Sequence, residues 1–175
     1  KTGLEVTRLS LGVAEIWRKE QSSRDMADAE RVLWTALDSG INFLDTAACY
    51  GSTEELIGRT VADRRDEYVL ATKCGHSRAL GGKDWTERTV EESIERSLKR
   101  MRTDRLDVVQ LHSCGLDVLK RGEVVSALVK AKEAGKTRFI GVSQFSLKDL
   151  EAARAVMKKH PIVANQVLFN LLRRE

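Results

Sequence analysis

The sequence is poor in the features that mark several structural classes. Its three cysteines are odd in number and not closely spaced, which argues against a disulfide framework and favours a reducing cytoplasm. No apolar run approaches the roughly 18 residues that a membrane helix needs, and no signal-peptide pattern opens the chain. A single proline and a hydrophobic content of 42% in 175 residues indicate a globular chain. We therefore expect one cytoplasmic domain over residues 1–175, with a trimmed start because no initiator methionine is present.

Two familiar nucleotide-binding loops are also absent. Neither GxGxxG after a first strand nor GxxxxGK[ST] occurs, so nucleotide binding through either loop has no support. The formal net charge is only +4, and the basic residues are dispersed over clusters such as Arg64-Arg65 and Arg173-Arg174. Such clusters are typical of solvated helix faces and ends rather than of a polyanion-binding stripe. We expect no nucleic acid partner and no membrane.

What the sequence does contain is a regular alternation of two patterns. Short apolar runs predict strands at residues 9–14, 41–46, 68–73, 106–112, 137–143 and 162–168. Between them, apolar residues recur at helical spacing, which predicts helices at residues 25–39, about 53–62, 86–101, about 124–135 and 146–160. Alternation of this kind requires a parallel sheet with right-handed crossovers.

Capping residues and breakers support the predicted helices. Ser52 followed by Glu55 predicts a capping box, and Thr86 and Ser146 are typical N-cap residues. The last helix should end before Pro161, because the residue that precedes a proline is pushed out of the helical region. A tryptophan inside the first helix, at position 34, is expected in the core.

Polar residues stand at the carboxyl ends of successive strands: Asp45, Lys73, His112, Ser143 and Gln166. An open sheet concentrates its site at one switch point, whereas a barrel brings every strand end to one mouth. The pattern therefore favours an α/β fold of the TIM (β/α)₈-barrel type. A complete barrel usually needs about 250 residues, so we expect about six of the eight strand-helix units.

Three of these polar residues, together with Tyr50, suit acid-base chemistry on a carbonyl group. Tyr50, five positions after Asp45, has an unperturbed pKa of about 10, and a neighbouring Lys73 cation would lower that pKa. A carboxylate on Asp45 would keep Lys73 charged and in place. His112 could orient a carbonyl oxygen or share in proton delivery. Together they predict a proton-donating group for a carbonyl that receives a hydride.

Six segments, in order, resemble the signatures of the aldo-keto reductase superfamily: FLDTAACYG with STEELIG, VLATK, VVQLH, GKTRFIGVSQFS and ANQVLFNLLRRE. The resemblance implies NADPH-dependent reduction of aldehydes and ketones on a TIM barrel. It also implies a small-molecule carbonyl substrate and Tyr50 as the general acid of a tetrad. The other tetrad residues are Asp45, Lys73 and His112. The neutral residues that would bind the nicotinamide carboxamide are Ser143, Gln144, Asn165 and Gln166.

The sequence departs from the family pattern in two ways. The family usually has Ser-Asn where this chain has Ser143-Gln144. The family's last two strand-helix units, which hold much of the cofactor, have no counterpart. An open six-stranded sheet would expose two edges and apolar helix faces, so we expect either a homo-oligomer or a disordered remainder. The alternative function is a non-catalytic barrel segment that acts as a binding module.

Alternatives remain for single residues. Lys73 could form a Schiff base, but that role leaves Tyr50 unexplained. Cys49, Cys74 and Cys114 each lie within two residues of a tetrad position and could bind zinc with His112 or act as an oxidation-sensitive thiol. Neighbouring strand residues point to opposite faces and no CxxC spacing exists, so no metal is expected. His112 could be a buried structural histidine. Trp17 and Trp85 could line a substrate pocket or pack against loops.

Overall fold

The computed structural model describes residues 2–17, 23–78 and 80–174, without the side chains of residues 17, 23 and 24. Its six strands form one sheet in the order β1-β2-β3-β4-β5-β6, and each neighbouring pair is parallel. The strands are β1 (Leu11–Gly12), β2 (Phe43–Asp45), β3 (Val69–Cys74), β4 (Leu106–Leu111), β5 (Thr137–Ser143) and β6 (Ile162–Gln166). The helices are α1 (Ala14–Trp17), α2 (Ser23–Asp38), α3 (Thr53–Thr60), η1 (Ala62–Glu67), α4 (Glu87–Met101), α5 (Leu116–Arg121), α6 (Glu123–Glu133) and α7 (Leu147–Val156).

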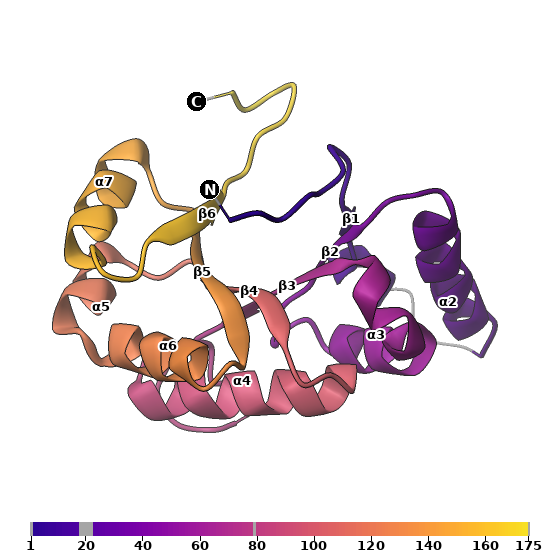
Figure 1. The fold of residues 1–175 in the computed structure, drawn as a ribbon, viewed down its shortest axis with the longest axis horizontal. Coiled ribbons are helices and arrows are strands. Elements are labelled where there is room, and N and C mark those ends of the chain that lie inside the picture. Colours follow the sequence, from indigo (N-terminus) through magenta and orange to yellow (C-terminus); the bar gives the residue numbers. More distant parts are fainter. Residues whose placement is uncertain (1, 18–22, 79, 175) are drawn as a thin grey trace.

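The sheet is curled, and helices follow its outer side from α2 round to α7 (Figure 1). This arrangement confirms the expected barrel type with six of its eight strand-helix units. The register places Asp45 opposite Ala71, and Lys73 opposite Gln110. Because partners in a parallel ladder point to the same face, Asp45, Lys73 and Gln110 all lie on the inner side of the curl.

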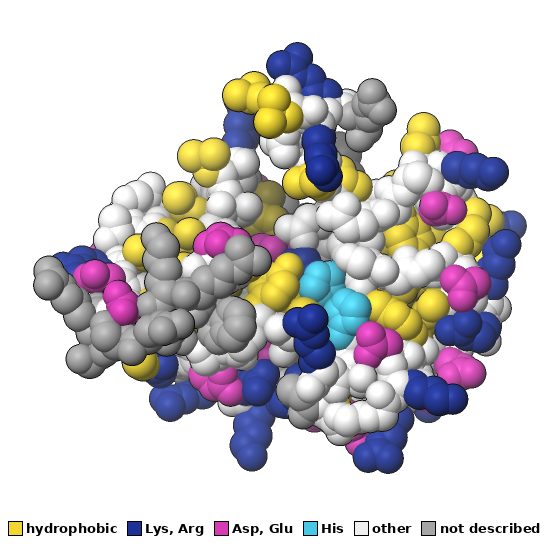
Figure 2. Space-filling view, turned by 180° about the vertical axis from the view of Figure 1, so that it is seen from behind, with side chains coloured by type: hydrophobic (Ala, Val, Ile, Leu, Met, Phe, Trp, Pro, Cys, Tyr) yellow, Lys and Arg dark blue, Asp and Glu magenta, His cyan; other side chains and the backbone are white. Residues whose placement is uncertain are grey.

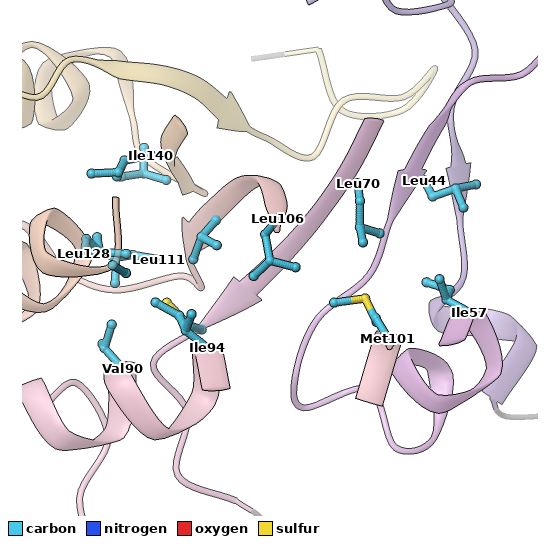
Figure 3. Close-up of a cluster of buried hydrophobic side chains, with 14 of the residues drawn as sticks. Leu44, Ile57, Leu70, Val90, Ile94, Met101, Leu106, Leu111, Leu128 and Ile140 are labelled. Atoms are coloured by element: carbon cyan, nitrogen blue, oxygen red, sulfur yellow. The ribbon is translucent and has the colours of Figure 1, made fainter. Parts of the chain in front are cut away.

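The hydrophobic core fills the layer between the sheet and the helices. Leucines from the strands meet apolar side chains from the helices in one cluster, which Figure 3 shows in close-up. Its labelled members are Leu44, Ile57, Leu70, Val90, Ile94, Met101, Leu106, Leu111, Leu128 and Ile140. Each fully buried side chain of this size stabilises the fold by about 1.5–3 kcal/mol before entropy is counted. The core thus fixes the strands whose ends carry the polar residues.

Two of the three predicted helix caps are confirmed. The Thr86 hydroxyl accepts a hydrogen bond from the Thr89 amide, and the Ser146 hydroxyl accepts one from the Asp149 amide. The capping box at Ser52 was wrong, because the Ser52 side chain makes no capping hydrogen bond to α3. Ser52 has φ −94° and ψ 10°, outside the extended region that aims a capping oxygen at the helix end.

One side chain expected in the core is exposed instead. Trp34 is 45% exposed, because the core face of α2 is formed by its neighbours such as Leu33, and the Trp34 indole N–H donates to the Thr60 carbonyl at 3.0 Å. The prediction of Trp34 as a core residue was therefore wrong. Its indole bridges α2 to the end of α3.

Element boundaries differ from the expectation mainly at the two ends of the described chain. The first strand covers only Leu11–Gly12, because the chain turns into α1 directly after the buried Val13. The last strand ends at Gln166 instead of residue 168. The strand at 137–143 is confirmed without change. Among the described residues, no helix has the length and apolar character that crossing a membrane would require.

Candidate active site

The centre of the site is an ion pair between the ends of β2 and β3. Lys73 Nζ donates to both carboxylate oxygens of Asp45, at 2.9 and 2.7 Å, and to the Thr46 carbonyl at 2.9 Å. Only 3% of the Lys73 side chain is exposed. All three ammonium protons therefore have acceptors, and the lysine is held as a cation in one position.

Tyr50 lies in a loop whose first residues are hydrogen-bonded to the end of β3. The Thr46 amide donates to the Ala71 carbonyl and the Ala48 amide donates to the Lys73 carbonyl, both at 3.0 Å. These bonds continue the ladder beyond β2 and fix the start of the loop. The Tyr50 ring centroid then lies 5.2 Å from Lys73 Nζ. The phenol, the lysine and the carboxylate therefore share one site.

The pKa of the Tyr50 phenol is raised above its ordinary value. Burial is the main cause, since it disfavours the phenolate, and the Asp45 carboxylate adds to the effect. The expected lowering of the Tyr50 pKa was therefore wrong, because burial and the Asp45 carboxylate together raise the pKa despite the nearby Lys73. At neutral pH the phenol therefore keeps its proton and can act as an acid.

His112 lies beside Tyr50 just beyond the end of β4. The two ring centroids are 5.6 Å apart and the planes are nearly perpendicular. His112 Nδ1 lies 3.3 Å from Cys49 Sγ. Burial lowers the pKa of His112 to about 4, with further lowering by His76 and Lys73. The imidazole is therefore neutral at pH 7 and can orient an oxygen atom without adding a charge.

The residues predicted to contact a nicotinamide carboxamide lie at the ends of β5 and β6. The Ser143 hydroxyl is buried, where it donates to the Leu111 carbonyl at 3.3 Å and accepts from the Ser113 amide at 2.9 Å. Gln166 Nε2 donates to Asp45 Oδ2 at 3.0 Å, which brings Gln166 into direct contact with the ion pair. One side-chain amide thus connects β6 to the ion pair of Asp45 and Lys73.

Asn165 and Gln144 are placed differently from Gln166. The Asn165 amide donates to the Phe145 carbonyl at 2.9 Å and its oxygen accepts from the Phe145 amide at 3.3 Å, so both ends of the side chain serve the backbone. Neighbouring strand residues point to opposite faces, so Asn165 faces away from the side that Gln166 occupies. Gln144 is exposed and has a left-handed backbone with φ 62°. The exposed amides of Gln144 and Gln166 could hold a carboxamide, which both donates and accepts hydrogen bonds.

The three thiols have different surroundings. Cys74 and Cys114 belong to the hydrophobic core, and burial raises the pKa of both, that of Cys114 to about 12. Cys49 is half-buried against His112, and burial raises its pKa as well. High pKa values keep these thiols protonated and weakly nucleophilic at neutral pH. Within residues 2–17, 23–78 and 80–174, no group of three His, Cys, Asp or Glu residues is arranged to hold a metal ion.

A cavity of about 610 Å³ opens beside Tyr50 and His112. Charged and polar side chains line much of it, including Glu15, His76, Arg78 and Asp84. In Figure 2, histidine side chains reach the surface next to basic and acidic ones. The sequence pattern did not single out His76, although a histidine three positions after Lys73 in a glycine-containing loop was a usable signal.

The two tryptophans that were candidates for a pocket have different outcomes. The Trp85 ring lies 4.6 Å from the His76 ring, between centroids, and so packs against a side chain that lines the cavity. The side chain of Trp17 lies outside the described residues. Trp85 is not among the residues that line the cavity, so the alternative in which it packs against a neighbouring loop residue is the one that the structure supports.

Comparison with known proteins finds one family. The model of the aldo/keto reductase family matches residues 8–175. The chain is 35% identical to the aldo-keto reductase YhdN of Bacillus subtilis, over 99% of this chain and 53% of that protein. It is 36% identical to the 6-dehydroglucose reductase of Novosphingobium aromaticivorans, over 87% of this chain and 52% of that protein. A solved aldo-keto reductase structure from Pseudomonas aeruginosa superposes with a TM-score of 0.83 at 32% identity, over 99% of this chain and 67% of that one. The chain thus spans about half the length of the curated relatives it matches.

Proposed function

Because the chain belongs to the aldo/keto reductase family, we propose that the protein reduces aldehydes and ketones to alcohols with NADPH as the hydride donor. One observation carries the proposal. Lys73 is held by both oxygens of Asp45, 5.2 Å from the ring centroid of a protonated Tyr50, and the ring centroid of a neutral His112 lies 5.6 Å from that of Tyr50. This set supplies one acid and one neutral orienting group at a single place, which is what addition of a hydride to a carbonyl requires.

Tyr50 is the proton donor in the proposed reaction. When bound, the nicotinamide supplies a hydride to the carbonyl carbon. As negative charge develops on the carbonyl oxygen, Tyr50 transfers its phenolic proton to that oxygen and becomes a phenolate. Lys73 Nζ lies 5.2 Å from the centroid of the Tyr50 ring. Its positive charge stabilises the phenolate, because a nearby opposite charge favours the ionised form. Solvent then returns a proton to Tyr50.

His112 orients the carbonyl oxygen toward Tyr50. Its imidazole is neutral because burial lowers its pKa to about 4, so one ring nitrogen carries a proton and can donate to the oxygen. Cys49 lies next to Nδ1 at 3.3 Å, which leaves Nε2 as the nitrogen to contact the substrate. A neutral donor polarises the carbonyl without competing with Tyr50 for the role of acid.

The exposed amides at the ends of β5 and β6 fit the proposed cofactor. Gln144 and Gln166 would hold its carboxamide, and Ser143 would support Gln144 by fixing the end of β5. Asn165 would contribute through the backbone of Phe145, because its amide is already bonded there. NADPH is the form of the cofactor that we propose.

We further propose that the substrate is a small polar carbonyl compound rather than an apolar one. The cavity beside Tyr50 is lined by Glu15, His76 and Arg78, which suit hydroxyl groups better than a hydrocarbon chain. The Novosphingobium relative is, by its name, a reductase of 6-dehydroglucose, a sugar derivative. Three free cysteines support a reducing compartment, and we propose the cytoplasm.

The proposal is tested by measuring NADPH oxidation with a simple hydroxyaldehyde and with a hydrocarbon aldehyde of similar size. We expect reduction of both, with the hydroxyaldehyde preferred. Tyr50→Phe removes the proton donor and leaves the ring, so kcat should fall by about 10²–10⁴-fold. Full activity in Tyr50→Phe would refute the mechanism.

A further inference from the structure

The loop after β3 places a second histidine against His112. The ring centroids of His76 and His112 are 4.9 Å apart, with the planes at 69°. The ring of His76 also lies 4.6 Å from that of Trp85. His76 therefore touches the proposed orienting residue and an aromatic side chain at the same time, and it lines the cavity beside Tyr50.

Asp84 fixes the His76 ring. Asp84 Oδ2 lies 2.9 Å from His76 Nδ1, while Asp84 Oδ1 accepts from both the amide and the hydroxyl of Ser77, each at 2.7 Å. The hydrogen bond to His76 and those to Ser77 lower the pKa of Asp84 to about 2. An ionised carboxylate only accepts hydrogen bonds, so His76 Nδ1 carries the proton in this pair.

The backbone of the loop brings Trp85 close to His76. A side chain on Gly75 would place its Cβ 2.2 Å from Trp85 Cζ3, so only glycine lets the indole lie this close. Gly75 has φ +113°, and Trp85 itself has a left-handed backbone with φ 61°. A left-handed tryptophan is strained, and such strain persists only where the surroundings hold it. Here the Trp85 amide donates to the Gly75 carbonyl at 2.9 Å.

From these contacts we propose that His76 is a positioning residue for His112. Asp84 holds His76 in one orientation, and the His76 ring holds the neutral His112 ring facing Tyr50. The inference rests on the proposed function, because it assigns His76 a role in orienting the substrate carbonyl through His112. His76 itself transfers no proton in this scheme.

Two variants test the His76 ring and its hydrogen bond to Asp84 independently. Asp84→Asn keeps an oxygen for Ser77 but replaces the acceptor that holds His76. His76→Phe keeps a ring against Trp85 and His112 but loses the bond to Asp84. The matched control is Lys83→Ala, which removes an exposed side chain next to Asp84 in the same loop and leaves the hydrogen bonds of Asp84 to His76 and Ser77 in place.

We expect kcat to fall by about 10- to 100-fold in Asp84→Asn and in His76→Phe, because a small misplacement of an orienting group has an effect of this size. KM should change by less than about threefold, and Lys83→Ala should stay within about threefold of the original protein in both constants. Unchanged kcat in both variants would overturn the proposal. A rise in KM with unchanged kcat would also overturn the proposal, because it would show that His76 contributes to substrate binding and not to the orientation of His112.

A second readout needs no turnover. Nitrogen-resolved NMR of the imidazole rings, assigned with His112→Gln, should show one neutral tautomer of His112 in the original protein and in Lys83→Ala. In Asp84→Asn and His76→Phe it should show a mixture of tautomers or a shifted titration. Identical His112 signals in all four proteins would refute the positioning role. Full activity of Tyr50→Phe would instead refute the proposed function, so the two failures are distinguishable.

Discussion

Lys73 is the residue on which the electrostatics of the site depend. It is 3% exposed, and its ammonium group donates to Asp45 twice and to the Thr46 carbonyl. Removing one partner of a buried ion pair leaves the other charge without compensation, which is more damaging than removing both. We therefore expect the loss of Lys73 alone to destabilise the fold more than the loss of the charges of both Lys73 and Asp45.

Lys73→Met should lower the free energy of unfolding by about 3–5 kcal/mol, because Asp45 would remain buried and charged. The double variant Asp45→Asn/Lys73→Met should recover part of that loss. Urea denaturation of the two variants and the original protein measures both effects. A loss below about 1 kcal/mol in Lys73→Met would contradict the geometry of the pair.

Asp107 performs a purely structural task at the opposite end of β4. Its carboxylate accepts from the Leu70 amide at 2.9 Å, from Arg65 at 2.6 Å and from Arg138 at 2.9 Å. Burial alone would raise the pKa of Asp107, but the bonds to Leu70 and to the arginines outweigh it and lower the pKa. The charged form is thus more stable in the folded chain than in the unfolded one.

The stabilisation by Asp107 should depend on pH. Its folded pKa lies below the value of about 3.9 in an unfolded chain, so the contribution is complete above about pH 4 and is lost as pH falls through the folded pKa. Asp107→Asn should reduce the unfolding free energy by about 1–3 kcal/mol at pH 7 and by less below about pH 3. Exposed Asp104→Asn is the matched control. An equal loss at both pH values would disprove the linkage.

The helices α3 and α4 approach each other closely at Gly58, which lies against the backbone of Arg100. A Cβ on Gly58 would lie 2.1 Å from the backbone carbonyl oxygen of Arg100, a distance that real Cβ atoms do not tolerate. Since the obstacle is backbone, a larger residue has to push the two helices apart. The close crossing places α3, and with it the end of the Tyr50 loop, against the rest of the helical layer.

Gly58→Ala is therefore expected to destabilise the protein by about 1–3 kcal/mol or more through overpacking. Gly12→Ala is the matched control, because a Cβ there meets nothing within 4 Å. Thermal unfolding of the two variants gives the comparison. Equal melting temperatures for both would show that the helix crossing is not tight.

Long periodic segments were predictable from the sequence, and short or irregular ones were not. The strand at 137–143 and the helix α2 follow their patterns because many side chains share the same preference. The helix α5, Leu116–Arg121, has too few residues to show a helical period, so it was not predicted. The exposure of Trp34 depends on where α3 ends, which no local pattern records.

Part of the candidate site was likewise predictable from the sequence, and part was not. Asp45, Lys73 and His112 stand at strand ends, so the topology alone brings them together. The pairing of His76 with Asp84 lies inside one loop and depends on the left-handed Trp85, which is a tertiary detail. The direction of the pKa shift of Tyr50 required the depth of burial, which the sequence does not contain.

At the scale of the whole molecule, β1 and β6 are the outer strands of the described sheet. Beyond β6, apolar side chains are highly exposed, with Phe169 at 70%, Leu171 at 83% and Leu172 at 95%. We propose that residues 1–175 form one domain and that this surface favours self-association. Sheet edges and contiguous apolar surface are the features that natural proteins usually cover.

A polypeptide of these 175 residues should therefore form dimers or larger species as its concentration rises. Leu171→Ser/Leu172→Ser should shift the equilibrium toward the monomer, because it removes two exposed apolar side chains. Light scattering after size-exclusion chromatography measures both. A strictly monomeric protein at all concentrations would contradict the prediction.

The central claim is that Tyr50 protonates a carbonyl oxygen while the carbon receives a hydride from the nicotinamide. Its most direct test is mass spectrometry of the alcohol formed from an aldehyde with NADPH that carries deuterium at both C4 positions. We predict one deuterium on the carbinol carbon with the original protein, and at least about 100-fold slower formation of the same product with Tyr50→Phe. An alcohol without deuterium, or labelled alcohol formed at an equal rate by Tyr50→Phe, would contradict the claim.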